Sequence, residues 1–167
     1  MSTSDRLLLI LHIGFAIFTL GPLTAATMST PRYIRKRNAV VVRYLHRTTQ
    51  IYGIGTLGIF LFGMALAKGD LAKVWLSVSM TLFIVALVLL LIVERDQRKA
   101  VHLLEAAGRE KAPSSRPAGD EDEEKPGHRK ADDGADIAQV ERGRIAAISG
   151  VVAVIWLAIL VLMVWNG

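Results

Sequence analysis

Four apolar segments, each about as long as a lipid bilayer is thick, dominate this sequence. They run over residues 7–28, 50–67, 74–93 and 145–165, and none of them contains Asp, Glu, Lys or Arg. An α-helix rises about 1.5 Å per residue, so about 20 residues cross a hydrocarbon core of roughly 30 Å. Because backbone amides in lipid must be paired within the protein, each segment should be helical. The sequence therefore predicts an all-α membrane protein with four transmembrane helices.

The polar residues divide the chain into three parts. Residues 1–93 hold the first three predicted transmembrane helices, with a short basic loop at residues 29–49. Residues 94–144 form the only long polar segment, and residues 145–167 hold the fourth helix. This division predicts one membrane domain that is interrupted by a single long cytoplasmic loop between the third and fourth helices.

The long polar segment changes character along its length. Residues 94–111 keep a helical composition, with Val101 and Leu104 as a thin apolar edge. The third helix should therefore continue about two to four turns beyond the bilayer. Residues 112–136 are rich in Pro, Gly and charge and lack the apolar residues that offset ordering entropy, so the isolated loop should be partly disordered. The acidic run at residues 120–124 is either a solvated linker or a tether for a basic surface on a partner.

Charge is distributed very unequally between the two sides that four crossings define. Of the 20 Lys and Arg residues, 17 lie in residues 29–49 and 94–144, and three lie elsewhere. Positive residues favour the cytoplasmic side, so both loops should be cytoplasmic and both termini outside a bacterial plasma membrane. Residues 1–26 could alternatively form a cleaved signal. However, Asp5 offsets Arg6 and the apolar run is long, which favours retention.

Six cations of the first loop form a patch that suits anionic lipid headgroups such as those of cardiolipin, at about 1 kcal/mol per cation. Nucleic-acid binding is not expected, because the loop is short, is held to the bilayer at both ends and has no recognition fold around it. The six residues are Arg32, Arg35, Lys36, Arg37, Arg43 and Arg47.

Small residues recur along single faces of the first, second and fourth apolar segments. Helices in lipid associate through such faces because small side chains let backbones approach closely. The stripes predict either packing within this chain or docking against another membrane protein. The residues expected to form these interfaces are Gly14, Gly21, Gly55, Gly58, Ala146, Gly150 and Ala153.

The sequence offers little reactive chemistry. Ion pumps keep ionisable residues inside their membrane spans, and here only His12 and the edge residue Gln50 are notably polar. There is no cysteine, and no paired carboxylates or phosphate loop stand out. His12 and His46 should lie about 20 Å apart across the core, too far to hold one haem. We therefore expect no enzyme activity, no metal and no cofactor, with His12 as the one candidate contact for a cofactor or quinone held by a partner.

The stretch LHIGFAIFTLGP, at residues 11–22, resembles the start of a bacterial family of small integral membrane proteins without assigned activity. The whole chain is similar to the prokaryotic respiratory supercomplex association factors. That resemblance implies a non-catalytic accessory subunit beside the cytochrome bcc complex and the cytochrome aa-type oxidase. Two alternatives stay open: a self-contained haem- or quinone-binding redox protein, and a small homo-oligomeric membrane protein or channel.

Overall fold

The computed structural model describes residues 3–68, 72–110 and 126–166, with side chains described for 3–68, 72–109 and 139–166. The described chain is helical throughout apart from short turns, which confirms the predicted all-α class. Each helix contains a stretch long and apolar enough to cross a membrane, as expected of a multi-pass membrane protein. The helices are α1 (Thr3–Arg35), α2 (Ala39–Ala67), α3 (Val74–Glu110) and α4 (Pro126–Asn166).

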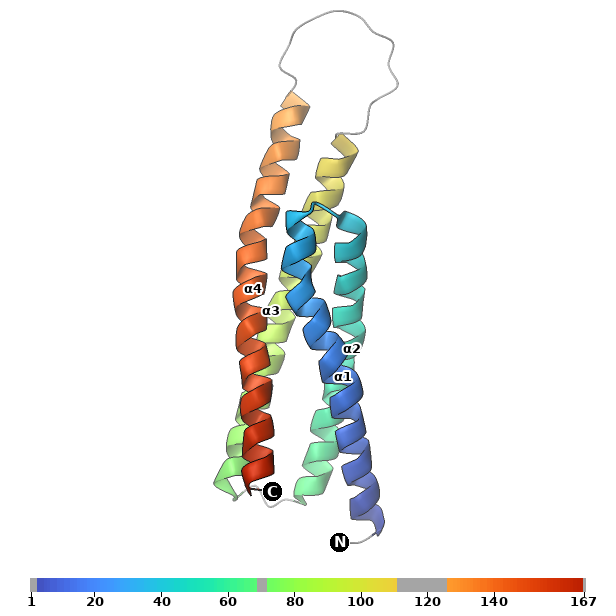
Figure 1. Cartoon of the computed structure of the whole chain (residues 1–167), viewed down its shortest axis with the longest axis vertical. Helices are drawn as coiled ribbons and strands as arrows, with labels where there is room; N and C mark the ends of the chain where they lie inside the picture. The colour runs from blue at the N-terminus through green and yellow to red at the C-terminus, as the bar shows by residue number, and fades with distance from the viewer. Residues whose placement is uncertain (1–2, 69–71, 111–125, 167) are drawn as a thin grey trace, which may run out of the picture.

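The four helices run up and down in an elongated bundle (Figure 1). α1 packs mainly against α2, and α3 packs mainly against α4, while α1–α4 and α2–α3 contacts join the two pairs. Both ends of the described chain lie at one end of the bundle, here called the terminal end. The opposite end, where α1 meets α2, is called the basic end. There α3 and α4 extend beyond the α1–α2 turn (Figure 1).

The turn between α1 and α2 is far shorter than the predicted loop at residues 29–49. Only residues 36–38 lie outside the helices, with Arg37 at a positive φ of 51°. The Asn38 side chain accepts a hydrogen bond from the Val41 amide at 3.1 Å and caps α2. The prediction was wrong because helix continues outside the apolar segments wherever it can bury a side chain. Ile34 and Val42, which stand among the cations, are both 0% exposed.

One of the helices that flank the long polar segment is longer than predicted. α3 continues to Glu110, as the helical composition of residues 94–111 predicted, but α4 begins at Pro126 rather than near Ile145. Residues 126–136, predicted as part of a disordered linker, form the first part of α4, while residues 111–125 lie outside the described residues. Val101 and Leu104 are buried, as their apolar edge predicted. They join Ile34, Val42 and Ile145 in a core cluster at the basic end.

A second core cluster lies nearer the terminal end. Ile59 of α2, Phe83 of α3 and Ile159 of α4 are its buried members, and Phe60 and Trp156 pack against them. Ala16 and Leu20 of α1 also pack against it, so all four helices meet here. Large side chains hold helices apart, and the site described next lies beside this cluster.

Candidate functional site

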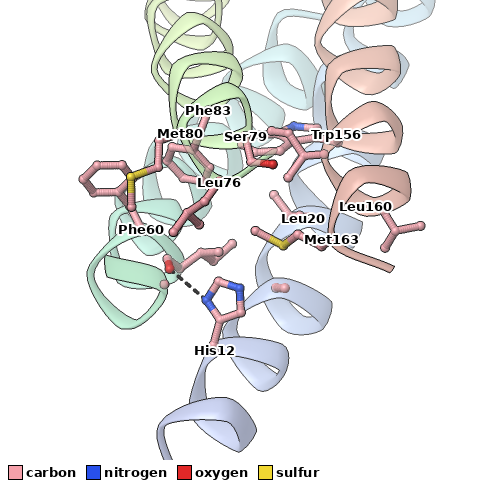
Figure 2. A pocket seen from close by; sticks show the side chains of 14 residues that line it. His12, Leu20, Phe60, Leu76, Ser79, Met80, Phe83, Trp156, Leu160 and Met163 are labelled. Carbon is pink, nitrogen blue, oxygen red and sulfur yellow. Dashed lines mark hydrogen bonds between the residues drawn. The ribbon is translucent and has the colours of Figure 1, made fainter. Parts of the chain in front are cut away.

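A cavity lies among all four helices near the terminal end of the bundle. Its volume is about 120 Å³, and Figure 2 shows side chains from the surrounding helices converging on it. Its wall is almost entirely apolar, as in most small-molecule sites. The lining residues are His12, Ala16 and Leu20 of α1; Ile59, Phe60 and Gly63 of α2; Leu76, Ser79, Met80 and Phe83 of α3; and Trp156, Ile159, Leu160 and Met163 of α4.

His12 is held in place by α2. Its Nδ1 lies 2.9 Å from the carbonyl oxygen of Ile59, the hydrogen bond drawn in Figure 2. Gly63 leaves room for the ring, because a Cβ at that position would lie 3.1 Å from His12 Cε1. The imidazole therefore bridges α1 and α2 with a fixed orientation, and its second nitrogen lies on the cavity side of the ring in Figure 2.

Aromatic rings form the wall of the cavity that faces the second core cluster. The Phe60 and Phe83 centroids lie 5.3 Å apart, and Phe83 meets Trp156 edge-on at 5.1 Å. Such offset and edge-to-face pairs are favourable beyond the apolar area that they bury. The Ser79 hydroxyl donates to the Trp75 carbonyl at 2.8 Å, within its own helix. The Ser79 hydrogen is therefore already used, and the wall stays largely apolar.

A second cavity of about 450 Å³ adjoins the first at the terminal end. The two cavities share His12, Gly63, Leu76 and Met163 as lining residues. The second is more polar, because Lys68 and Lys73 also line it. Lys68 Nζ forms an ion pair with Asp5 Oδ1 at 2.6 Å. His12 thus stands at the boundary between an apolar chamber and a partly charged one.

The predicted small-residue interfaces divide into two groups. Gly55 and Gly58 face α1: a Cβ at Gly55 would lie 3.1 Å from Thr19 Cγ2, and one at Gly58 would lie 2.7 Å from the Phe15 ring. A Cβ on Gly14, Gly21 or Gly150 would meet nothing within 4 Å. Ala146 is exposed and Ala153 is half-buried. Two predicted positions therefore lie in a close contact within the chain, while the others leave open surface.

All six predicted lipid-contact cations are exposed at the basic end. Arg43 Nε donates to Glu105 Oε1 at 2.8 Å, and Lys36 Nζ lies 5.7 Å from the Tyr33 ring centroid. Arg32 and Arg35 instead line a groove of about 560 Å³ between α1 and α4, together with Arg142. Arg142 was not among the predicted lipid contacts, since only the fold brings α4 beside the end of α1. The remaining groove residues are Met28, Pro31, Gly143 and Ala146.

A buried polar layer near the basic end was missed altogether. Asp96, Gln97 and Glu141 are buried, with Asp96 only 1% exposed. Arg144 Nη2 lies 3.0 Å from Asp96 Oδ2, and Gln97 Nε2 donates to Thr30 Oγ1 at 2.7 Å. A signal was present in the sequence, because Asp96 and Gln97 fall in one helical stripe with the following apolar residues. The prediction for this stretch was only a helical extension with Val101 and Leu104 as its apolar edge.

His12 and His46 occupy different levels of the bundle. His12 contacts the carbonyl of Ile59, and His46 lies 3.7 Å from Glu94. Ile59 and His46 both belong to α2 and lie about 20 Å apart along its axis, so the two histidines are separated by about that distance along the bundle. Within the described residues, no group of three or more His, Cys, Asp or Glu residues is placed to hold a metal ion. Comparisons with protein-family models, curated proteins and solved structures find no match for this chain.

Proposed function

We propose that this protein is a non-catalytic accessory subunit that packs against larger integral membrane proteins. One face of α1 supports the proposal. Gly14, Gly21 and Ala25 lie along it at helical spacing, and Gly21 and Ala25 are exposed. Phe18, on the same face, is 77% exposed. In lipid, a flat stripe of small residues beside a projecting ring favours close packing with another helix, and the chain's own helices leave this face uncovered.

The partners proposed are respiratory membrane complexes, the cytochrome bcc complex and the cytochrome aa-type oxidase. The support is the resemblance of the whole chain to the prokaryotic respiratory supercomplex association factors. Residues 11–22, which resemble the start of a family without assigned activity, include Gly14, Phe18 and Gly21 of the uncovered face. A subunit of this kind contributes surface rather than reactive groups to the assembly.

The proposed orientation places both termini outside a bacterial plasma membrane and the basic end in the cytoplasm, with residues 94–144 on the cytoplasmic side. The unequal distribution of Lys and Arg supports it. The Arg32, Arg35 and Arg142 groove would then lie at headgroup level and bind anionic lipid such as cardiolipin. None of these three arginines has a carboxylate partner in the described part of the chain.

A pulldown of the full chain in a gentle detergent tests the docking proposal. The wild-type protein should recover haem-containing complexes, and Gly21→Leu should reduce that recovery at least fivefold. A Cβ built on Gly21 would meet nothing within 4 Å beyond its own stretch of helix, so the bundle itself should fold normally. Gly108→Leu is the matched control, because Gly108 also has open space around it but lies on the extension of α3. Recovery of the chain alone, or equal recovery by both variants, would contradict the proposal.

A further inference from the structure

The hydrogen bond between His12 and Ile59 determines what the cavity can bind. A carbonyl oxygen can only accept, so Nδ1 of His12 carries the hydrogen in this contact. In the neutral ring the other nitrogen, Nε2, then has a lone pair and no hydrogen. Figure 2 shows this nitrogen on the side of the ring that faces the cavity. The cavity therefore presents a hydrogen-bond acceptor to whatever enters it.

The rest of the wall gives that acceptor no partner. No hydrogen bond to His12 Nε2 exists within the described residues, and the Ser79 hydrogen is used within α3. An acceptor that faces an apolar chamber and has no partner there favours a ligand that donates a hydrogen bond to it. A ligand that offers only carbonyl oxygens would place lone pair against lone pair.

The dimensions suit a single six-membered ring. The cavity measures about 120 Å³, close to the roughly 150 Å³ of an engineered apolar cavity that binds benzene. Methyl or isoprenoid substituents can extend into the adjoining cavity of about 450 Å³ that shares His12 and Met163 with it. The side chains around the ring of the bound ligand would include the aromatic groups of Phe60 and Phe83 and the thioether of Met80.

We propose that this cavity binds the ring of a lipid-soluble quinol, with a ring hydroxyl donating to His12 Nε2, and that it favours the quinol over the corresponding quinone. The quinone offers two carbonyl acceptors and no donor, whereas a quinol hydroxyl can donate to His12. The proposal concerns binding and selection of the reduced form. It does not depend on the docking proposal, because it is measured on the isolated chain.

Calorimetric titration of the full chain in lipid nanodiscs, under anaerobic conditions, tests the preference. The probes are tetramethylhydroquinone, tetramethylbenzoquinone and the hydrocarbon 1,2,4,5-tetramethylbenzene, with titrations into empty nanodiscs subtracted. Tetramethyl substitution blocks covalent addition to the quinone ring. The quinol should bind about tenfold more tightly than the other two probes, the effect of one satisfied hydrogen bond. Quinone affinity equal to or above quinol affinity would overturn the proposal.

Two variants locate the binding. His12→Asn keeps an N–H near the Ile59 carbonyl but removes Nε2, so the quinol should lose its tenfold advantage while the hydrocarbon affinity stays the same. Ala16→Phe fills the cavity and should abolish binding of all three probes. Undiminished quinol binding by either variant, shown to be folded by circular dichroism, would overturn the assignment.

Nitrogen-15 NMR of the wild-type protein provides a readout that needs no variant. With labelled histidine, the His12 Nε2 resonance should move when the quinol is added and stay in place when the hydrocarbon is added. An unmoved His12 resonance at saturating quinol would overturn the proposal even if both variants failed to fold.

Discussion

The ring of Phe15 on α1 occupies the space that a side chain on Gly58 of α2 would need. A Cβ built on Gly58 would lie 2.7 Å from two ring carbons of Phe15, closer than real Cβ atoms approach a neighbour. The same ring packs against Phe62 of α2, with centroids 5.2 Å apart. The glycine therefore sets how closely α1 and α2 approach at the level of the cavity, where His12 must reach the Ile59 carbonyl.

Gly58→Ala should destabilise the bundle. The added methyl group displaces the Phe15 ring, and overpacking of this kind costs about 1–3 kcal/mol. The gain in helix propensity from Gly to Ala, about 1 kcal/mol, offsets part of that cost. Thermal unfolding in detergent should show a lower midpoint for Gly58→Ala. Gly14→Ala is the matched control and should leave the midpoint unchanged or raise it, because a Cβ there meets nothing within 4 Å.

Adding Phe15→Ala to Gly58→Ala tests the mechanism of that loss. If the ring causes the clash, the double variant should be more stable than the sum of the two single changes predicts, since contacting residues are coupled. Strict additivity would show that the cost of Gly58→Ala arises elsewhere in α2.

Arg144 balances a carboxylate that water does not reach. Asp96 is 1% exposed, and Arg144 lies 3.0 Å from it. Arg144→Met should therefore destabilise the bundle by about 2–4 kcal/mol, because it leaves a buried charge without its partner. Adding Asp96→Asn should restore part of the loss, measured as denaturant midpoints in micelles. A double variant less stable than Arg144→Met would contradict this account.

Arg98→Met provides the comparison for that pair. Arg98 also contacts a carboxylate, Glu94, at 2.9 Å, but its side chain is 56% exposed. Exposed pairs within one helix contribute about 0.3–0.5 kcal/mol, so this variant should be close to wild type. Comparing Arg144→Met with Arg98→Met shows whether the loss of stability comes from burial of the carboxylate or from the loss of any ion pair.

How much of this structure the sequence reveals depends on the kind of interaction. Hydrocarbon-length uncharged segments fix the number of helices, because lipid leaves the backbone no alternative. The ends of the helices were missed where apolar residues such as Val42 and Ile145 stand among charges and still reach a core. The contact of His12 with Ile59 and Gly63 joins residues far apart in the sequence, so it depends on helix pairing that no local pattern encodes.

Binding of anionic lipid should depend on the arginines that have no acidic partner among the described residues. Changing Arg32, Arg35 and Arg142 to Gln should weaken cardiolipin retention, read by native mass spectrometry, by about fivefold for each cation removed. The control combines Arg43→Gln with Arg98→Gln, since these two arginines already contact Glu105 and Glu94. The control should retain cardiolipin nearly as well as wild type. Equal loss in both variants would show a diffuse charge effect and no groove.

The proposed orientation leads to the last prediction, and the absence of cysteine from the sequence makes it simple to test. Ala72→Cys and Gly108→Cys each place a single thiol at an exposed position, one between α2 and α3 and the other near the end of α3. A membrane-impermeant maleimide added to intact spheroplasts should label Ala72→Cys and spare Gly108→Cys. After lysis both should be labelled.

The reason for this outcome is the difference in flanking charge. The basic end carries the arginine groove and the cations around Gly108, whereas the turn at Ala72 has only Lys68 and Lys73 beside it. Moving the basic end outward would mean translocating most of the chain's Lys and Arg, against the preference that orients membrane helices. Labelling of Gly108→Cys in intact spheroplasts would show that the orientation is the opposite of the one proposed. The groove of Arg32, Arg35 and Arg142 would then face the outer leaflet, and the cavity at His12 would open toward the cytoplasm.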